Sequence, residues 1–90
     1  MAEAARVLLF DAMRAYTERD AVLASEVIER DDEIDSMYKR NLKLLEVEMQ
    51  EDREMVPAGT RYMFILAALE RVGDRANNIG WHTKDMIGAT

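Results

Sequence analysis

The chain has no cysteine, one proline, four glycines and one histidine among its 90 residues. The lack of cysteine excludes a disulfide framework and a thiolate metal site. Turn residues are scarce, and β-branched residues do not alternate with polar ones as strands require, so we expect an all-α fold. With a single histidine, the chain lacks the Glu-x-x-His pairs of di-iron carboxylate enzymes, and no convincing Ser-His-Asp set can be assembled. Both absences favour a protein that is not an enzyme.

Positive charge and long apolar runs are also scarce. The chain has 12 Lys and Arg against 18 Asp and Glu, for a formal net charge of -6. A nucleic-acid backbone requires a basic surface, so we expect cations or basic partner surfaces rather than nucleic acid. No run approaches the roughly 20 apolar residues of a membrane span. No membrane insertion is therefore expected.

Ninety residues allow one small domain, which we place over 1–90. Apolar periodicity predicts helices at roughly 2–16, at 20–50, and from near Pro57 to 87. Asp20 and Asp52 are the expected N-caps, and Gly88 is the expected terminator of the last helix. The sequence thus predicts a three-helix antiparallel bundle, small enough that partner chains would help to stabilise it.

The predicted second helix carries aspartates in its core seam, where a bundle would ordinarily place leucine. The seam steps alternately by four and three residues: Ala24, Ile28, Asp31, Asp35, Tyr38, Leu42, Leu45 and Met49. We expect Val27, Ile34 and Leu44 to widen it. The first helix should bury Ala5, Leu8 or Leu9, Ala12 or Met13, and Tyr16. The third should bury Ile65, Leu69, Val72, Ala76 and Ile79, with Met63, Ala67, Glu70, Asp74, Asn77 and Trp81 on a second covered face.

Two carboxylate pairs at helical spacing, Asp31/Asp35 and Glu70/Asp74, are the candidate metal ligands. A carboxylate removed from water costs several kcal/mol unless it is protonated, paired or bound to a cation. Oxygen ligands favour hard cations such as magnesium, calcium, manganese or iron. The alternatives are a solvated acidic patch for the first pair and, for the second, salt bridges to Arg71, Arg75 or a partner.

Five residues near these pairs bear on the same site. Gly73, inside a helix, indicates a tight crossing of another backbone beside Asp74. Asn77 and Asn78, one turn further on, offer amide oxygens as additional ligands. His82 is expected at the surface, while Trp81 is expected to pack or to anchor a partner.

Two segments resemble the PhoU family. Residues 69–79, LERVGDRANNI, are similar to its hallmark L-E-R-I-G-D-(H/R)-x-x-N-I, and residues 30–38, RDDEIDSMY, are similar to its second acidic motif, D-D-x-I-D followed by an aromatic residue or leucine. Their order and separation also match. The likeness spans nearly the whole chain and corresponds to one repeat, resembling the C-terminal half, of a protein that normally has two.

The resemblance implies a three-helix repeat of a six-helix arrangement and a negative regulator of high-affinity phosphate transport and phosphate-starvation signalling. The implied partners are a phosphate ABC transporter and a sensor histidine kinase, which would hold a cytoplasmic protein at the inner face of the membrane. Some members bind divalent or trivalent metal ions, of which iron, manganese, magnesium or zinc would fit here.

By the same resemblance, the metal motifs match Asp31 to Asp35 and Glu70 to Asp74, and Asn78, rather than Asn77, matches the closing asparagine. A homodimer would supply the missing repeat. The residues also leave open a purely structural helical association module without bound metal. A carboxylate-bridged metalloenzyme is disfavoured because second-shell histidines are missing.

Overall fold

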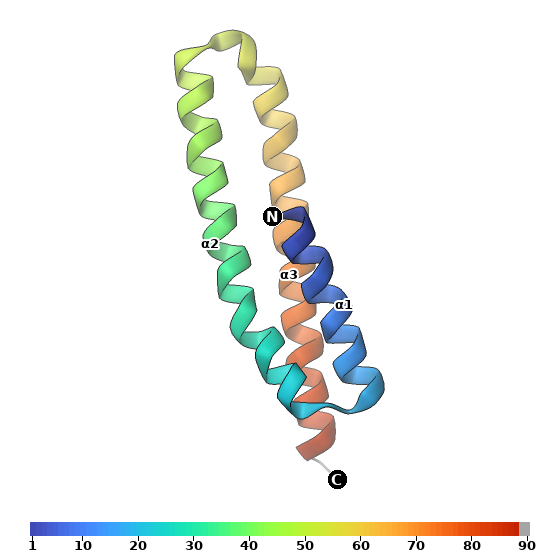
Figure 1. Ribbon diagram of the computed structural model, residues 1–90. Helices are drawn as coiled ribbons and strands as arrows, with labels where there is room; N and C mark the ends of the chain where they lie inside the picture. The colour runs from blue at the N-terminus through green and yellow to red at the C-terminus, as the bar shows by residue number, and fades with distance from the viewer. Residues whose placement is uncertain (89–90) are drawn as a thin grey trace.

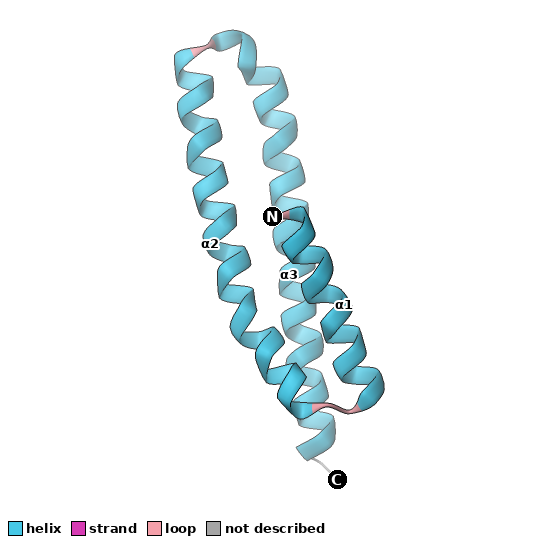
Figure 2. Ribbon diagram, in the orientation of Figure 1, coloured by secondary structure: helices cyan, strands magenta, loops and turns pink. Residues whose placement is uncertain are grey.

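Three helices make up the computed structural model, which describes residues 1–88. They are α1 (Ala2–Glu18), α2 (Ala21–Glu51) and α3 (Val56–Gly88), with a short 3-10 helix at Arg53–Met55. The helices run antiparallel in chain order, and only short connections separate them (Figures 1 and 2). The predicted all-α bundle is confirmed. Among the described residues no helix is long and apolar enough to cross a membrane.

The turn between α1 and α2 is set by Arg19 and Asp20. Arg19 adopts a left-handed conformation with φ 54°, and the Asp20 amide donates to the Ala15 carbonyl at 2.9 Å, which closes the end of α1. The Asp20 carboxylate then accepts from the Leu23 amide at 3.0 Å, confirming the predicted N-cap of α2. These two residues reverse the chain without glycine or proline.

The second turn begins at Asp52, whose carboxylate accepts from the Glu54 amide at 3.0 Å. The predicted cap is therefore present, although it opens the 3-10 helix rather than α3. Pro57 lies in the first turn of α3, where its missing N–H costs no hydrogen bond. Gly88, the predicted terminator, is the last helical residue described.

The core lies where α1 crosses α2 and α3, in the lower half of a rod about 56 Å long and 17 Å wide (Figure 1). Its buried members come from all three helices: Ala5, Leu8, Ala12, Val27, Ile34 and Ala76. Arg30 ties α2 to α1 through a 2.8 Å ion pair with Asp11. The helices approach closely at Gly80, where an added Cβ would lie 3.1 Å from the Ala24 carbonyl oxygen.

Four apolar residues that were expected to be covered are exposed instead: Tyr16, Leu44, Ile65 and Trp81. On α1, Ala15 is fully buried whereas Tyr16 is largely exposed. Leu44 and Ile65, expected to widen the seams of α2 and α3, are 58% and 53% exposed. The predictions for Leu44 and Ile65 were wrong for one physical reason: both residues lie in the upper half of the α2–α3 hairpin, which α1 does not reach (Figure 1).

Candidate functional site

The four predicted acidic ligands lie on neighbouring turns of the two long helices, near enough for their charges to influence one another. Asp31 and Asp35 lie on successive turns of α2, and Glu70 and Asp74 lie on successive turns of α3. A shallow hollow at this crossing is lined by Tyr38, Ala67, Glu70, Arg71 and Asp74. We call Asp31, Asp35, Glu70 and Asp74 the acidic cluster.

Electrostatics link the members of the acidic cluster. Burial raises the pKa of the Asp31 carboxyl, and the charges of Asp74, Asp32 and Asp35 raise it further. Burial likewise raises the pKa of Glu70, with additional contributions from Asp35, Asp74 and Asp31 that outweigh the opposing effect of Lys39. Because these carboxyls bind protons more tightly in the folded state, their ionisation lowers stability as the pH rises through the folded pKa.

One nearby cation partly compensates this negative charge. The Lys39 ammonium lies 3.0 Å from the Asp35 carboxylate, four residues earlier on α2. Its hydrogen bond to Asp35 and the charges of Asp35 and Glu70 raise the pKa of Lys39. The pair is exposed to solvent, where such an ion pair contributes little to stability. Arg71 and Arg75, the predicted partners of Glu70 and Asp74, form no ion pair within residues 1–88.

Gly73 lies against side chains of α2 beside the cluster, whereas the predicted close approach of another backbone occurs at Gly80. A Cβ at residue 73 would lie 3.0 Å from an Asp31 carboxylate oxygen and 3.0 Å from the Ile34 side chain. The missing side chain therefore makes room for Asp31 between the helices. This crowding is also why Asp31 is partly desolvated although it lies near the surface.

The donor set suits a hard cation, but the side chains are not arranged as a finished coordination shell. Across the described part of the chain, no three acidic or histidine side chains lie close enough together to hold one metal ion. Carboxylates facing each other from two helices are nevertheless the ligands that magnesium, manganese and iron accept. A bound cation would have to draw these side chains inward by changes of rotamer.

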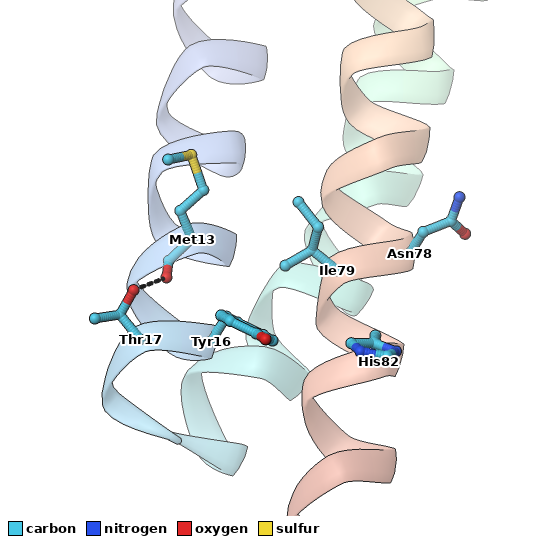
Figure 3. A pocket seen from close by; sticks show the side chains of 6 residues that line it. All are labelled: Met13, Tyr16, Thr17, Asn78, Ile79 and His82. Atoms are coloured by element: carbon cyan, nitrogen blue, oxygen red, sulfur yellow. Dashed lines mark hydrogen bonds between the residues drawn. The ribbon is translucent and has the colours of Figure 1, made fainter.

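The two asparagines occupy different positions. Asn77 faces α2 and donates from its amide nitrogen to the Ile28 carbonyl oxygen, at 3.5 Å. Asn78 is exposed, lines a groove between α1 and α3, and directs its side chain away from α1 (Figure 3). Asn77 is thus the amide that reaches α2, and the structure does not place Asn78, the favoured ligand, among the carboxylates.

The groove between α1 and α3 is a second concave feature, which the sequence did not predict. It is lined by Met13, Tyr16, Thr17, Asn78, Ile79 and His82 (Figure 3). The rings of Tyr16 and His82 stack, with centroids 6.2 Å apart and planes inclined by 19°. His82 is exposed, as predicted, and its ring packs on α1 rather than approaching the acidic cluster. Nearby, the Lys84 ammonium lies 5.2 Å from the centre of the exposed Trp81 ring.

Together, the fold and the cluster define a class of protein: an all-helical module in which two long helices carry four neighbouring carboxylates. The comparison with family models gives the particular family. Residues 1–81 match the PhoU domain, so the chain belongs to the PhoU family. This confirms the resemblance seen in the two acidic motifs.

Several curated relatives agree with this assignment. The chain is 39% identical over 79 residues to a phosphate-specific transport system accessory protein PhoU homolog of Clostridium acetobutylicum, covering 88% of this chain and 36% of the relative. A homolog of the same description from Rhizobium meliloti is 35% identical over 79 residues, which cover 88% of this chain and 33% of the relative. The PhoU homolog 1 of Methanothermobacter thermautotrophicus is 31% identical over 87 residues, which cover 97% of this chain and 40% of the relative.

The chain therefore spans about a third of the length of the curated relatives it matches. No solved structure matches the chain significantly.

Proposed function

We propose that this protein is a PhoU-type regulator that represses high-affinity phosphate transport and phosphate-starvation signalling. The observation that carries the proposal is the PhoU domain over residues 1–81, together with relatives described as accessory proteins of phosphate-specific transport systems. In this role the protein acts by binding partners rather than by catalysis. Its partners would be a phosphate ABC transporter and a sensor histidine kinase, at the cytoplasmic face of the membrane.

A transport experiment tests the regulatory role. Cells that lack the gene, grown in phosphate-rich medium, are expected to take up radiolabelled phosphate several-fold faster than the parent strain, because repression is lost. Reintroducing the wild-type gene should restore the low rate. Uptake that is equal in the parent and the deletion strain, at equal transporter abundance, would contradict a role in phosphate transport.

The acidic cluster is the proposed cation site. Asp31, Asp35, Glu70 and Asp74 would hold one hard cation between α2 and α3, or two adjacent ones, and Asn78 remains a proposed ligand only through the family motif. The raised pKa values of Asp31 and Glu70 support this, because burial and then the neighbouring carboxylates disfavour the charged form of each, and Lys39 opposes this at Glu70 only in part. Cation binding would remove the repulsion between the two helices and so stabilise the hairpin.

Metal binding is tested by equilibrium dialysis against manganese, followed by elemental analysis. The double variant Asp31→Asn/Glu70→Gln should lose at least about tenfold in affinity, because two charged oxygen ligands become neutral amides. The matched control is Asp32→Asn/Glu33→Gln, which removes the same charge from exposed positions beside the cluster. Equal metal content in the wild type and in both variants would eliminate the site.

The manganese-binding measurement also tests the second candidate function, a helical association module without metal. The Lys39–Asp35 ion pair and the lack of three converging ligands in residues 1–88 favour this alternative. It predicts no manganese binding and sedimentation that is unchanged by a chelator. Under either proposal we expect the chain to self-associate as a homodimer, because a bundle this small gains stability when a partner chain covers part of its surface.

A further inference from the structure

Lys39 is the basic side chain that pairs with the acidic cluster in the described part of the chain. Its ammonium lies 3.0 Å from the Asp35 carboxylate, whereas the other ion pairs within residues 1–88 include no member of the cluster. A lysine four residues after an aspartate lies one turn further along the same side of the helix. Across the helices, burial and neighbouring carboxylates raise the pKa of Glu70, and the charge of Lys39 lowers it. Lys39 therefore supplies positive charge to acids of both helices.

The acidic cluster has two levels along the helices, and Lys39 compensates one of them. After burial, the largest contribution to the raised pKa of Glu70 comes from Asp35. After burial, the largest contribution to the raised pKa of Asp31 comes from Asp74. This pattern indicates that each acid of α2 lies opposite one acid of α3. Lys39 acts at the level of Asp35 and Glu70.

The ion pair of Lys39 and Asp35 is open to water. Their side chains are 73% and 44% exposed, whereas those of the Arg30–Asp11 pair are 34% and 17% exposed. On release from Asp35, the ammonium regains hydrogen bonds to water and the long lysine side chain regains rotamer freedom. The lysine can therefore leave the carboxylate at little cost.

A cation that enters the cluster competes with this lysine. The Asp35 Oδ2 atom that accepts from Lys39 is one of the oxygens that a bound cation would need. An ammonium at this place also repels an approaching cation. A divalent ion carries twice the charge of the ammonium and prefers carboxylate oxygens, so it attracts the facing acids more strongly. Binding of a divalent ion thus favours exchange for the lysine.

From these contacts we infer that Lys39 is an internal counter-ion of the proposed cation site, which holds Asp35 in the metal-free protein and leaves it when a divalent cation binds. Lys39 does not bind the cation. It lowers the affinity of the site and contributes to stability only while the site is empty. The inference rests on the cation site proposed above and specifies its regulation, because a metal ion must reach a concentration that displaces the lysine.

Equilibrium dialysis against manganese tests the competition. Lys39→Met removes the ammonium but keeps the length and helix propensity of the side chain, and it should bind manganese on the order of fivefold more tightly than the wild type. Lys39→Arg keeps the charge and should bind as the wild type does. Lys43→Met is the matched control, because it removes the same charge from an exposed lysine of α2 that forms no ion pair within residues 1–88. Its affinity should stay within about twofold of the wild type at physiological ionic strength.

Thermal unfolding with and without manganese tests the displacement. Without metal, Lys39→Met should melt at a lower temperature than the wild type, because Asp35 loses its counter-ion. With saturating manganese the two proteins should melt alike, because the lysine contacts Asp35 in neither. Manganese should therefore raise the melting temperature of the variant by more than that of the wild type. An equal rise in both would show a purely structural ion pair and overturn the inference.

A double-mutant cycle separates displacement from repulsion at a distance. In an Asp35→Asn background, Lys39→Met should change the affinity for manganese by less than about twofold, because the lysine no longer holds a carboxylate. A gain that persists in full in this background would show that Lys39 acts through its charge alone. That result would overturn its assignment as the counter-ion of Asp35.

The remaining outcomes separate this inference from the cation site on which it rests. Manganese that binds equally to the wild type, Lys39→Met and Lys43→Met would overturn the role of Lys39 but not the site. Binding by Lys39→Met and not by the wild type would support the role of Lys39 and show that the lysine keeps the site closed. Manganese that binds to neither would overturn both the site and the inference.

Discussion

Replacing Leu8 with alanine is expected to lower the free energy of unfolding by about 3 kcal/mol. Leu8 is 1% exposed and is among the largest fully buried side chains of the protein, packed where α1 meets α2 and α3. Its truncation removes buried apolar surface and leaves a cavity that a thin bundle closes only in part. Because a chain of this size is stabilised by only about 5 to 13 kcal/mol in total, the effect is large.

Urea denaturation followed by circular dichroism measures this change. Leu8→Met is the control, because it keeps the volume and apolar character of the side chain and should cost less than about 1.5 kcal/mol. If Leu8→Ala unfolded at the same urea concentration as Leu8→Met, the packing of α1 on the hairpin would be in doubt. Both variants should be measured at low concentration, so that self-association does not contribute.

Gly80→Leu is expected to lower the free energy of unfolding by about 2 kcal/mol or more, although leucine is a better helix former than glycine. A Cβ at this position would lie 3.1 Å from the Ala24 carbonyl oxygen and 3.0 Å from the Ile28 side chain. The backbone oxygen cannot rotate away, so α2 and α3 must separate to make room for the larger side chain.

Gly88→Leu provides the matched control, because an added Cβ at residue 88 has no neighbour within 4 Å. The melting temperatures of the two variants should differ clearly. The free energy of unfolding of Gly88→Leu should lie within about 0.5 kcal/mol of the wild-type value. Equal melting temperatures would show that α3 does not approach α2 as closely at residue 80 as described.

Most of the fold could be predicted from the sequence, because the helical pattern is long and the capping residues are distinct. Asp20 and the apolar rows of α2 and α3 indicated where the helices begin and end to within about two residues. The errors at Leu44 and Ile65 have another origin. Periodicity shows which side of a helix is apolar, but it does not show how far a neighbouring helix extends along that side.

Helical spacing predicted that each acidic pair lies on one side of its helix, and the four charges do influence one another across α2 and α3. Their role as metal ligands stays a prediction. The role of Lys39 was missed, although a lysine four residues after Asp35 is a recognisable signal for a helical ion pair. Spacing placed Asn77 on the same side of the helix as Glu70 and Asp74, and Asn77 is the amide that reaches α2. Asn78 was favoured as a ligand only because it matches the family motif.

Gly73 and Asp31 share a single small volume between the long helices, which has an evolutionary consequence. Any side chain at residue 73 would intrude on the space of the Asp31 carboxylate, because its Cβ would lie 3.0 Å from a carboxylate oxygen. The effect of a substitution at either site therefore depends on which residue occupies the other. A lineage that enlarges residue 73 is expected to replace the acid at residue 31 with a smaller residue, so residues 73 and 31 should covary among homologous sequences.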